Sequence, residues 1–568
     1  MRRKAIFRKR DPQESLFQSN MLVPPAKAQR LQRSWAEVFR NRALPLIDEE
    51  RFADMYCEDN GRPNRAVQTV LGVHILKEMS NLTDEEALEE LEFNLLWHHA
   101  LRLDIEETHL PQKTLHNFRG RLMPHDGGRV AFQETTDQII TALGIRTGKQ
   151  RLDSTHIMSN IAILTRLGLF CETMRYFFGA LRRDLPHLME AVPTALVRRY
   201  LKEEGEPTSY EDARSGDGRR RLSVCARDLY RLVDRFRGTA AAGLEEYRLL
   251  ERLLREQCLV GRDSDGRPGD DDDDAGETKV PIALKDPKEV PSDSLQSPYD
   301  PEATYSGHKG KGYEAQVAET CDEENICQII TLVEVTPSSG SDTDVTVPAI
   351  ESLAERNARP DELFADTSYG SGRNAFEAEL RGTELVSPVA GPTPAEKEGG
   401  EGEEPRLTPA DFQIDVTGGQ PTVCPAGNQS IEEYKRQDAP ERVEIHFARS
   451  VCETCSLRSR CPVKLNQHTG DYVLKADLVK VKIDRRRIAE ANEEWHKRYA
   501  IRAGIEGTNS ELKRRHGFGR LRVRGGRRVQ LAVYLKALAC NVKRMVRALQ
   551  MQESQAGRSK QALVAVPA

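Results

Sequence analysis

Strand patterns on both sides of a long helical stretch constrain the fold of this chain more than any other feature. Residues 149–154 have the pattern of a short strand, whereas apolar residues recur at helical spacing over 160–258. Beyond residue 310 the patterns alternate: a hairpin at 312–320 and 327–335, helices at 344–356 and 374–380, and strands at 363–366 and 384–388. We therefore predict an α/β core that starts near residue 149, is interrupted by a helical insertion, and resumes near residue 310.

The first 145 residues have a mostly helical pattern. Apolar residues recur at helical spacing over 67–76, and Thr83 precedes an acidic turn and a further amphipathic stretch, as expected of an N-capped helix. Residues 114–122 place apolar side chains on one face and arginines on the other, which fits a DNA-reading helical unit and a plain helical bundle equally. Two final helices are predicted at 496–515 and 528–549.

The composition limits the class of protein. A chain of 568 residues corresponds to roughly three or four domains. Its 84 Lys and Arg against 89 Asp and Glu leave a net charge of −5, which identifies no partner. No stretch approaches the ~18 consecutive apolar residues of a membrane-spanning helix, and the basic N-terminus lacks the apolar region of a secretory signal. Eleven cysteines are too few for a disulfide scaffold, so we expect a cytoplasmic protein in which clustered cysteines bind metal.

Charge is distributed unevenly along the chain. Residues 262–300 contain 12 acidic and 5 basic residues, with an aspartate run at 270–274, and predict a solvated linker. Mutual repulsion within the run makes a metal site there the weaker alternative. A second acidic linker is predicted at 391–405. In contrast, residues 496–547 contain 15 Lys and Arg against two Glu, a net charge of +13, which favours phosphate contact over a plain solvated helical face.

Two aspartates lie at the ends of predicted strands. Asp153 ends the first strand, in the sequence RLDST, and Asp366 ends a later strand, in LFADTSYG. Acids at strand ends are well placed to meet at one edge of a sheet, although a strand-ending Asp more often forms a turn or caps a helix. The two aspartates alone therefore give weak support for a catalytic site.

A third acid belongs to a helical stripe of unusual composition. The stripe consists of Tyr499, Arg502, Glu506 and Lys513. Its steps of 3, 4 and 7 residues place all four side chains on one face of a helix. A surface pair at i,i+4 accounts for Arg502 and Glu506 but leaves the tyrosine and the lysine unexplained. The stripe therefore favours a functional site.

The spacing of this stripe resembles the YREK signature of bacterial insertion-sequence transposases with a DDE catalytic core. Further segments resemble the same family in the expected order: GRPNRAVQTVLGVHIL at 61–76, TLHNFR at 114–119, DST at 153–155, SPYDPEATYSGHKGKGYEAQ at 297–316, ADTSYGS at 365–371 and RLRVRGGRRVQLAVYLKALACNVKR at 520–544. The resemblance covers most of residues 20–550 and is weakest over 160–290.

This resemblance implies an RNase H-like core, a mixed five-stranded sheet with flanking helices, in which Asp153, Asp366 and Glu506 meet at one edge. The three carboxylates would hold two Mg²⁺ or Mn²⁺ ions for an in-line phosphoryl transfer. By the same resemblance, Tyr499, Arg502 and Lys513 would contact the DNA backbone. The surrounding basic segment adds four predicted DNA-binding residues: Arg514, Arg520, Arg522 and Arg524.

Four cysteines lie between the second aspartate and the glutamate: Cys424, Cys452, Cys455 and Cys461. A Cys-x₂-Cys turn brings two thiolates to one ion, and the resembling transposases carry a similar Cys-rich insertion, so we predict a structural Zn²⁺ site. The segment has little apolar core of its own, which a bound metal would compensate. The alternatives are His446 or His468 in place of one cysteine, an iron–sulfur cluster, and unliganded or redox-active thiols.

Together these patterns predict the domain order and the activity. The predicted parts are a helical DNA-binding or assembly domain at 1–145, a catalytic core at 146–159 and 305–395, a helical insertion and acidic linker at 160–304, the Cys-rich insertion at 396–475, basic helices that complete the core at 476–550, and a disordered tail at 551–568. The expected function is a nucleoid-associated DNA transposase that binds its element ends as a homo-oligomer, cuts DNA and joins the 3′-hydroxyl to a target. The alternatives are an inactive or domesticated DNA-binding protein and an RNase H-like nuclease that cuts without joining.

Overall fold

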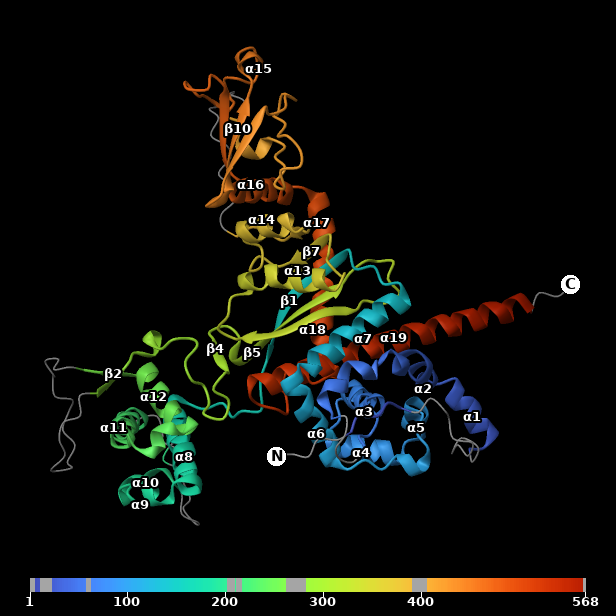
Figure 1. Cartoon of the computed structure of the whole chain (residues 1–568), viewed down its shortest axis with the longest axis vertical. Coiled ribbons are helices and arrows are strands. Elements are labelled where there is room, and N and C mark those ends of the chain that lie inside the picture. Colours follow the sequence, from blue (N-terminus) through green and yellow to red (C-terminus); the bar gives the residue numbers. More distant parts are fainter. Residues whose placement is uncertain are drawn as a thin grey trace.

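The computed structural model of the chain describes residues 6–10, 23–57, 63–201, 210, 217–261, 282–390 and 406–564. Figure 1 shows a central sheet with the N-terminal helices and a long C-terminal helix below it, the helical insertion to one side, and a smaller β unit at the far end. The aspartate run predicted at 270–274 and the linker predicted at 391–405 lie outside the described residues. None of the described helices is both long enough and apolar enough to cross a membrane.

The central sheet is mixed. Its strands are β1 (Lys149–Ile157), β4 (Thr304–Ser306), β5 (Gly310–Thr320), β6 (Ile330–Pro337), β7 (Glu362–Ala365) and β8 (Glu384–Val386). They follow the order β4-β5-β1-β7-β8, with β6 also paired to β5. β1 is antiparallel to β5 and parallel to β7, and β7 is parallel to β8. The five strands predicted for the α/β core are therefore confirmed, but the sheet has six strands and not the five that the resemblance implies, because the short edge strand β4 adds to β5.

Helices α13 (Thr346–Glu355) and α14 (Gly372–Leu380) cover one face of this sheet. Their apolar side chains pack with Leu152 of β1 and Leu363 of β7, which are both fully buried. Successive side chains in a strand point to opposite faces. Because Leu152 points towards this helical layer, Asp153 points away from it.

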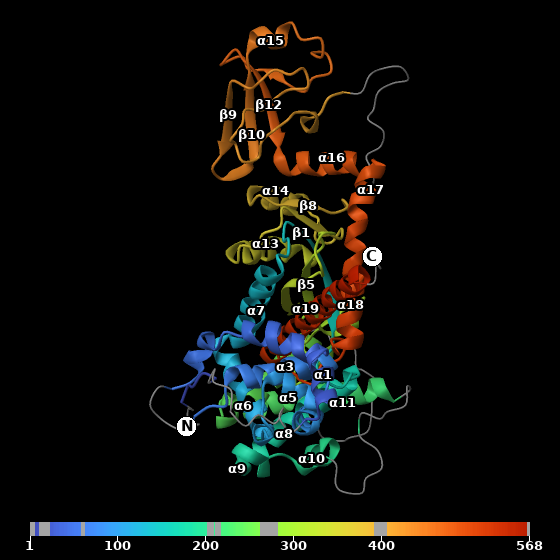
Figure 2. The same ribbon diagram turned by 90° about the vertical axis from the view of Figure 1, so that its right-hand side faces the viewer.

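The N-terminal helices and α19 (Gly526–Val564) share one apolar core with strands β5 and β6. The N-terminal helices are α1 (Pro25–Gln32), α2 (Trp35–Val38), α3 (Val67–Ser80), α4 (Asp84–Phe93), α5 (Leu95–Leu101), α6 (Gln112–Leu122) and α7 (Gly127–Leu143). The Asn541 side chain on α19 fixes this layer to the sheet, because it accepts from the backbone N–H of Ile330 and donates to its carbonyl, each at 2.8 Å. Figure 2 shows α19 in front of the sheet, with α3 and α5 below it.

The start of α4 and the end of α19 can be compared with the predictions from the sequence. Thr83 caps α4 in a capping box with Glu86, as the acidic turn predicts. The tail predicted as disordered at 551–568 is helical as far as Val564, because α19 continues beyond residue 549. Glutamine, alanine, glutamate, arginine and lysine dominate this extension, and their helix propensity favours continuation of the helix.

His74 makes the N-terminal core sensitive to acid. Neither ring nitrogen has a hydrogen-bond partner among the described residues, and the ring stacks on Phe118. Burial lowers the pKa of His74 to about 3, and the Arg119 and Lys77 charges act in the same direction. As the pH falls, the unfolded chain binds a proton at His74 near pH 6.5, before the folded chain does. Above the unfolded pKa of 6.5 the folded state therefore keeps its full stability with respect to this residue. This stability is lost progressively as the pH falls towards 3.

We therefore expect the free energy of unfolding to fall by about 1.4 kcal/mol per pH unit from this residue between roughly pH 6.5 and 3. His74→Leu should flatten the pH dependence of stability in that range, measured by urea unfolding at several pH values. The exposed histidine variant His125→Leu is the control. An unchanged slope in His74→Leu would show that the buried imidazole is not the acid-sensitive group.

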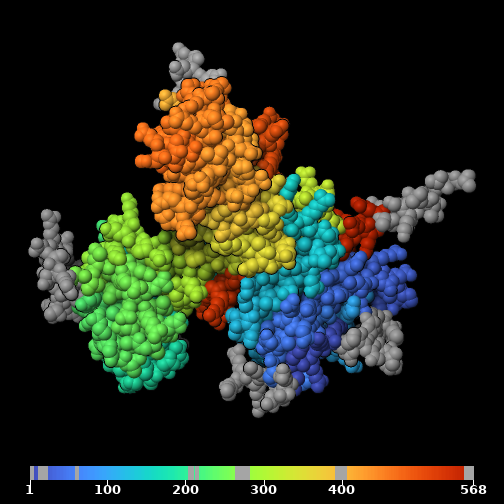
Figure 3. All heavy atoms as spheres, turned by 45° about the horizontal axis from the view of Figure 1, so that its top comes forward, coloured from blue at the N-terminus to red at the C-terminus, as the bar shows by residue number. Residues whose placement is uncertain are grey.

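The helical insertion folds around its own core. It consists of α8 (Arg166–Asp184), α9 (Pro186–Glu190), α10 (Thr194–Tyr200), α11 (Gly218–Phe236), α12 (Glu245–Gln257), β2 (Cys258–Val260) and β3 (Ile282–Leu284). Phe177, Phe178 and Tyr247 are at the centre of this core. The chain leaves the sheet at the end of β1 and re-enters it at the edge strand β4, so the insertion does not disturb the central strands. Figure 3 shows it as a separate lobe, in green.

The Cys-rich region forms a second sheet. Its strands are β9 (Glu432–Arg436), β10 (Ala439–Phe447), β11 (Lys464–Leu465) and β12 (Tyr472–Asp477), in the order β11-β12-β10-β9. Between β10 and β11 lies α15 (Arg449–Glu453), and after β12 the chain enters α16 (Leu478–Glu490). Phe412, Ile445, Phe447 and Leu474 form a buried core. The expectation that this region has little apolar core is therefore wrong, because aromatic residues distant in sequence converge between the sheet and α16.

Candidate active site

Asp153 and Asp366 lie side by side because their strands are parallel neighbours. β1 and β7 pair with Leu152 opposite Ala365, so the next residue along each chain is one of the two predicted acids. The Asp153 side chain is 14% exposed, and the Asp366 side chain, just beyond β7, is 36% exposed. β1 continues to Ile157, so Asp153 lies within the strand and not at its end as predicted.

The helix predicted over 496–515 is divided into three segments. They are α17 (Glu493–Tyr499), a 3-10 turn (Ala500–Ala503) and α18 (Gly504–Arg515). The Arg151 guanidinium donates to the carbonyl of Ile501 at 2.8 Å and lies where a Cβ on Gly504 would stand. Glycine at the start of α18 therefore permits the close approach of β1 to this turn. Arg502 comes from the turn, and Glu506 comes from the first turn of α18.

The Arg502 guanidinium contacts all three predicted acids. Nη2 lies 2.9 Å from Asp153 Oδ1 and 3.9 Å from Asp366 Oδ2. Nη1 lies 3.0 Å from Glu506 Oε1. The Arg502 side chain is 16% exposed, and its buried Nε has no hydrogen-bond partner among the described residues. Sequence reasoning placed Arg502 on DNA and missed that one cation joins the acids.

The site carries an excess of negative charge. Three carboxylates around one guanidinium leave a formal charge of −2. Burial raises the pKa of Asp153; the Arg502 charge opposes this shift, and the Asp366 charge reinforces it. Asn509 Nδ2 on α18 donates to the second Asp153 oxygen at 3.0 Å. The arrangement therefore favours the binding of further cations.

Glu319 on β5 holds α18 against the sheet. Its carboxylate is fully buried and accepts hydrogen bonds from three side chains: Arg151 Nε at 2.7 Å, Thr508 Oγ1 at 2.7 Å and Arg544 Nη1 at 2.9 Å. These donors belong to β1, α18 and α19. Glu319 therefore fixes the helix that carries Glu506, a role that no pattern in the sequence indicated.

Tyr499 and Lys309 flank the acids. The Tyr499 hydroxyl donates to the carbonyl of Ala365 at 3.1 Å, and its ring stacks on Trp495 with ring centroids 4.9 Å apart. Lys309 Nζ donates to Ser154 Oγ at 2.9 Å, one residue from the first acid. Sequence reasoning gave Lys309 no role, because only the antiparallel register of β5 with β1 brings its loop to the site.

The other predicted DNA-binding residues lie on α18 and the loop after it. Lys513, Arg514, Arg520, Arg522 and Arg524 are all exposed. Arg522 donates to the carbonyls of Leu82 at 2.7 Å and Asn81 at 3.0 Å, just beyond α3. The Arg524 guanidinium lies 4.9 Å from the ring centroid of Tyr299. These two arginines therefore also hold the loop after α18 against the residues that follow α3 and against Tyr299.

The four predicted cysteine ligands surround one small cavity. Cys424, Cys452, Cys455 and Cys461 line a space of about 20 Å³, enough for one water-sized particle. The backbone N–H of Asn428 donates to Cys424 Sγ at 3.4 Å, and burial beside the other thiols raises the pKa of Cys452 to about 11. No three of these sulfurs, all within the described residues, lie within 4.8 Å of one another. Neither His446 nor His468 lines the cavity.

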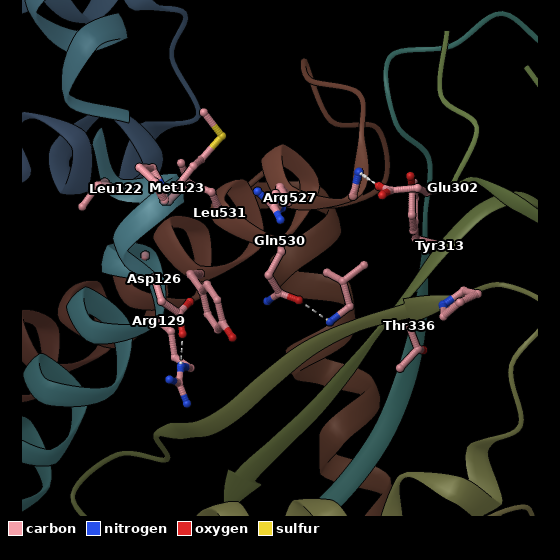
Figure 4. A pocket seen from close by; sticks show the side chains of 16 residues that line it. Leu122, Met123, Asp126, Arg129, Glu302, Tyr313, Thr336, Arg527, Gln530 and Leu531 are labelled. Carbon is pink, nitrogen blue, oxygen red and sulfur yellow. Dashed lines mark hydrogen bonds and ion pairs between the residues drawn. The ribbon is translucent and has the colours of Figure 1, made fainter. Parts of the chain in front are cut away.

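A larger cavity lies elsewhere, between α7, α19 and the β5–β6 hairpin. It has a volume of about 630 Å³, and none of the predicted site residues lines it. Figure 4 shows its charged side chains, with Arg129 paired to Asp126 and Glu302 turned towards the start of α19. The site at Asp153, Asp366 and Glu506 and this larger cavity therefore lie in separate parts of the fold.

Two family models match parts of the chain. Residues 423–546 match the family described as "Transposase DDE domain", and residues 30–121 match "Transposase domain (DUF772)". The first match includes Glu506 and most of the Cys-rich region, and the second extends from α1 to α6. No curated protein and no solved structure matches the chain. Both matches are to transposase domains, and they support a DNA transposase of the insertion-sequence type with a mixed α/β fold.

Proposed function

We propose that this chain cuts DNA at the ends of its own element and joins the freed 3′-hydroxyl to target DNA, with Asp153, Asp366 and Glu506 as the catalytic carboxylates. The observation that carries this proposal is the contact of one guanidinium with all three acids. The acids come from two parallel strands and a helix far away in sequence, so their convergence is a property of the fold. Both family matches support the same reaction class.

The architecture supports an RNase H-like core. The first strand, β1, lies between antiparallel β5 and parallel β7, and the helices α13 and α14 cover one face. One acid is on β1, the second follows β7, and the third is on a helix that contacts β1. This is the arrangement that the resemblance to DDE transposases leads us to expect.

The donor set fits hard divalent cations. All three side chains offer carboxylate oxygens, which Mg²⁺ and Mn²⁺ prefer, and their net charge with Arg502 is negative. Two such ions held by these residues would activate the attacking hydroxyl and stabilise the departing oxygen. Asn509 orients Asp153 and Glu319 holds α18, whereas the Glu506 side chain is 68% exposed and would move onto the ions as they bind.

Basic side chains around the acids would position the DNA. Arg502 and Lys309 lie beside the carboxylates, and Lys513 is exposed further along α18. Exposed Arg514, Arg520 and Arg524 extend this surface. Arg and Lys neutralise phosphates and fix the register of the duplex without reading its sequence. Since two element ends must be cut together, we propose a homo-oligomer on DNA.

Arg502→Ala is expected to weaken binding to the element end by several-fold and to lower the slope of log affinity against log salt by about 1. Binding isotherms at several salt concentrations would measure both. The matched control is Arg498→Ala, since Arg498 lies one turn earlier and pairs with Glu384 through Nη1 at 2.9 Å and Nη2 at 2.6 Å. The same salt slope in wild type and Arg502→Ala would rule out a phosphate contact.

The proposed reaction is tested with a labelled duplex that carries the DNA flanking this gene. We expect Mg²⁺-dependent nicking followed by transfer of the cut strand into a second duplex. Cleavage without joining would instead identify an RNase H-like nuclease. Specific binding with no chemistry in Mg²⁺ or Mn²⁺ would identify an inactive or domesticated DNA-binding protein.

The Cys-lined cavity supports a structural Zn²⁺ site. Its four thiols are the ligand set of a tetrahedral Zn²⁺ site around a space of about 20 Å³, and since no three of the sulfurs lie within 4.8 Å of one another, binding would draw them closer together. We expect Cys455→Ser to lower the zinc content of the purified protein by one equivalent and to lower the melting temperature of the β9–β12 unit. Metal analysis and calorimetry would measure the two effects, with the distant Cys327→Ser as control. Equal zinc in wild type and Cys455→Ser would exclude this ligand.

A further inference from the structure

A further group of metal-ligating side chains lies apart from the three acids and from the Cys-lined cavity. The ligand atoms of Glu511, His516 and Cys540 all lie within 4.8 Å of one another, and no other such group exists among the described residues. His516 and Cys540 are fully buried, and the Glu511 side chain is 24% exposed. Glu511 belongs to α18, His516 ends this helix, and Cys540 belongs to α19.

His516 presents an unused nitrogen to this group. Nδ1 lies 2.9 Å from the carbonyl oxygen of Glu78, so Nδ1 carries the proton that it donates. Nε2 then bears a lone pair, is buried, and has no hydrogen-bond partner among the described residues. An imidazole that donates Nδ1–H to a backbone carbonyl is typical of metal-bound histidine.

Glu511 and Cys540 complete the donor set. Arg544 Nη2 and Nε lie 2.9 and 3.1 Å from Glu511 Oε2, and the Arg544 charge is also matched by Glu319 at 2.9 Å. These bonds use one Glu511 oxygen, which leaves Oε1 for a metal. The Cys540 thiol would bind by releasing its proton to solvent. Arg151 and Arg544 are already balanced by Glu319 and Glu511, so the thiolate would compensate one of the two charges of the ion.

We propose that Glu511, His516 and Cys540 bind a Zn²⁺ ion between α18 and α19. A set of one nitrogen, one sulfur and one oxygen suits Zn²⁺, whereas Mg²⁺ takes oxygen ligands. Bonds of about 2.0 to 2.3 Å around tetrahedral zinc place ligand atoms about 3 to 4 Å apart, so the observed group needs only a small contraction. A water molecule or the second Glu511 oxygen would complete the coordination.

This ion would join two helices with different tasks. α18 carries Glu506, and α19 holds the N-terminal helices and the sheet together. A metal between them would fix the position of α18 from its C-terminal end, as Glu319 does from the sheet. The site is independent of the proposed transposition, because it depends only on how these two helices pack.

The test uses the full chain with the Cys-lined cavity disabled by Cys452→Ser and Cys455→Ser, so that Glu511, His516 and Cys540 form the remaining proposed metal site that contains a cysteine. Co²⁺ serves as the probe, since a bound thiolate gives a sulfur-to-cobalt charge-transfer band. We expect this background protein to bind one equivalent of Co²⁺ with that band, and Zn²⁺ to displace it. Adding Cys540→Ala should abolish the band, whereas the equally buried control Cys321→Ala should retain it.

Two results would overturn the proposal. The first is that the Cys452→Ser, Cys455→Ser protein shows no sulfur-to-cobalt band. This result requires no substitution at Glu511, His516 or Cys540. The second is an unchanged band after Cys540→Ala. If Cys540→Ala does not fold, His516→Gln provides the same comparison, with the band expected to shift or disappear. An unchanged spectrum in His516→Gln would exclude the histidine as a ligand.

Discussion

Asp366→Ala is expected to abolish both strand cleavage and strand transfer while leaving DNA binding largely intact. Its carboxylate makes few contacts that hold the fold: the Ser368 N–H at 2.8 Å and Arg502 at 3.9 Å. Loss of one metal-binding carboxylate removes several kcal/mol of charge stabilisation in the transition state, which corresponds to about a thousandfold in rate. Mg²⁺-dependent nicking and joining of the element-end duplex would measure the loss.

The same loss is expected for Asp153→Ala and Glu506→Ala. The matched control is Asp361→Asn, because Asp361 lies just before the opposite end of β7 and its side chain is 74% exposed. Cleavage at the wild-type rate by any one of the three variants would remove that residue from the catalytic set. A loss of DNA binding in parallel with cleavage would instead indicate that the acid acts through the fold.

Glu319→Gln is expected to destabilise the chain by about 3 to 5 kcal/mol, because it removes the shared counter-ion of two buried guanidiniums. Arg151 and Arg544 are 12% and 15% exposed, and both contact this carboxylate, which is 0% exposed. The same substitution should lower cleavage, since the amide leaves one oxygen to accept from Arg151, Thr508 and Arg544 and its NH2 group faces one of these donors, which loosens the contact of α18 with the sheet. Urea unfolding and the nicking assay would measure the two effects.

The control for this variant is Glu334→Gln on β6. The Glu334 carboxylate accepts from the Tyr534 hydroxyl at 2.8 Å, and an amide oxygen can accept that bond equally well. We expect Glu334→Gln to change stability by less than about 1 kcal/mol. Equal destabilisation by the two variants would show that burial of a glutamate, and not the Arg–Glu–Arg network, accounts for the effect.

The strands were accessible from the sequence because local patterns encode them, whereas the grouping of the three acids came from the resemblance to DDE transposases, and Asp153 lies within β1 and not at its end. A short apolar run from Leu363 to Ala365 ends at Asp366, and Thr83 precedes an acidic turn, so strand and cap follow from neighbouring residues. The spacing of Arg502 and Glu506 also indicated that the two side chains are neighbours. That pairing is confirmed by the Nη1–Oε1 distance of 3.0 Å.

The features that sequence reasoning missed depend on residues distant along the chain. Glu319 meets Arg544, and Asn541 meets Ile330, only after α19 has packed on the sheet. His516 is part of the basic segment in the sequence, yet its side chain is buried. Periodicity and spacing do not indicate such contacts. Each of the two segments that meet has the pattern of an ordinary helix or strand, and nothing in that pattern identifies its partner.

The shared core of the N-terminal helices and α19 also has a consequence for the order in which this protein is made. Helices α3 and α7 are synthesised first, but the apolar residues of α19 that cover them follow only after the helical insertion, the central sheet and the Cys-rich unit. The N-terminal helices therefore expose apolar surface until α19 has been made, and during that time they are open to chaperones and proteases. Until α19 has been made, the N-terminal helices cannot complete that core.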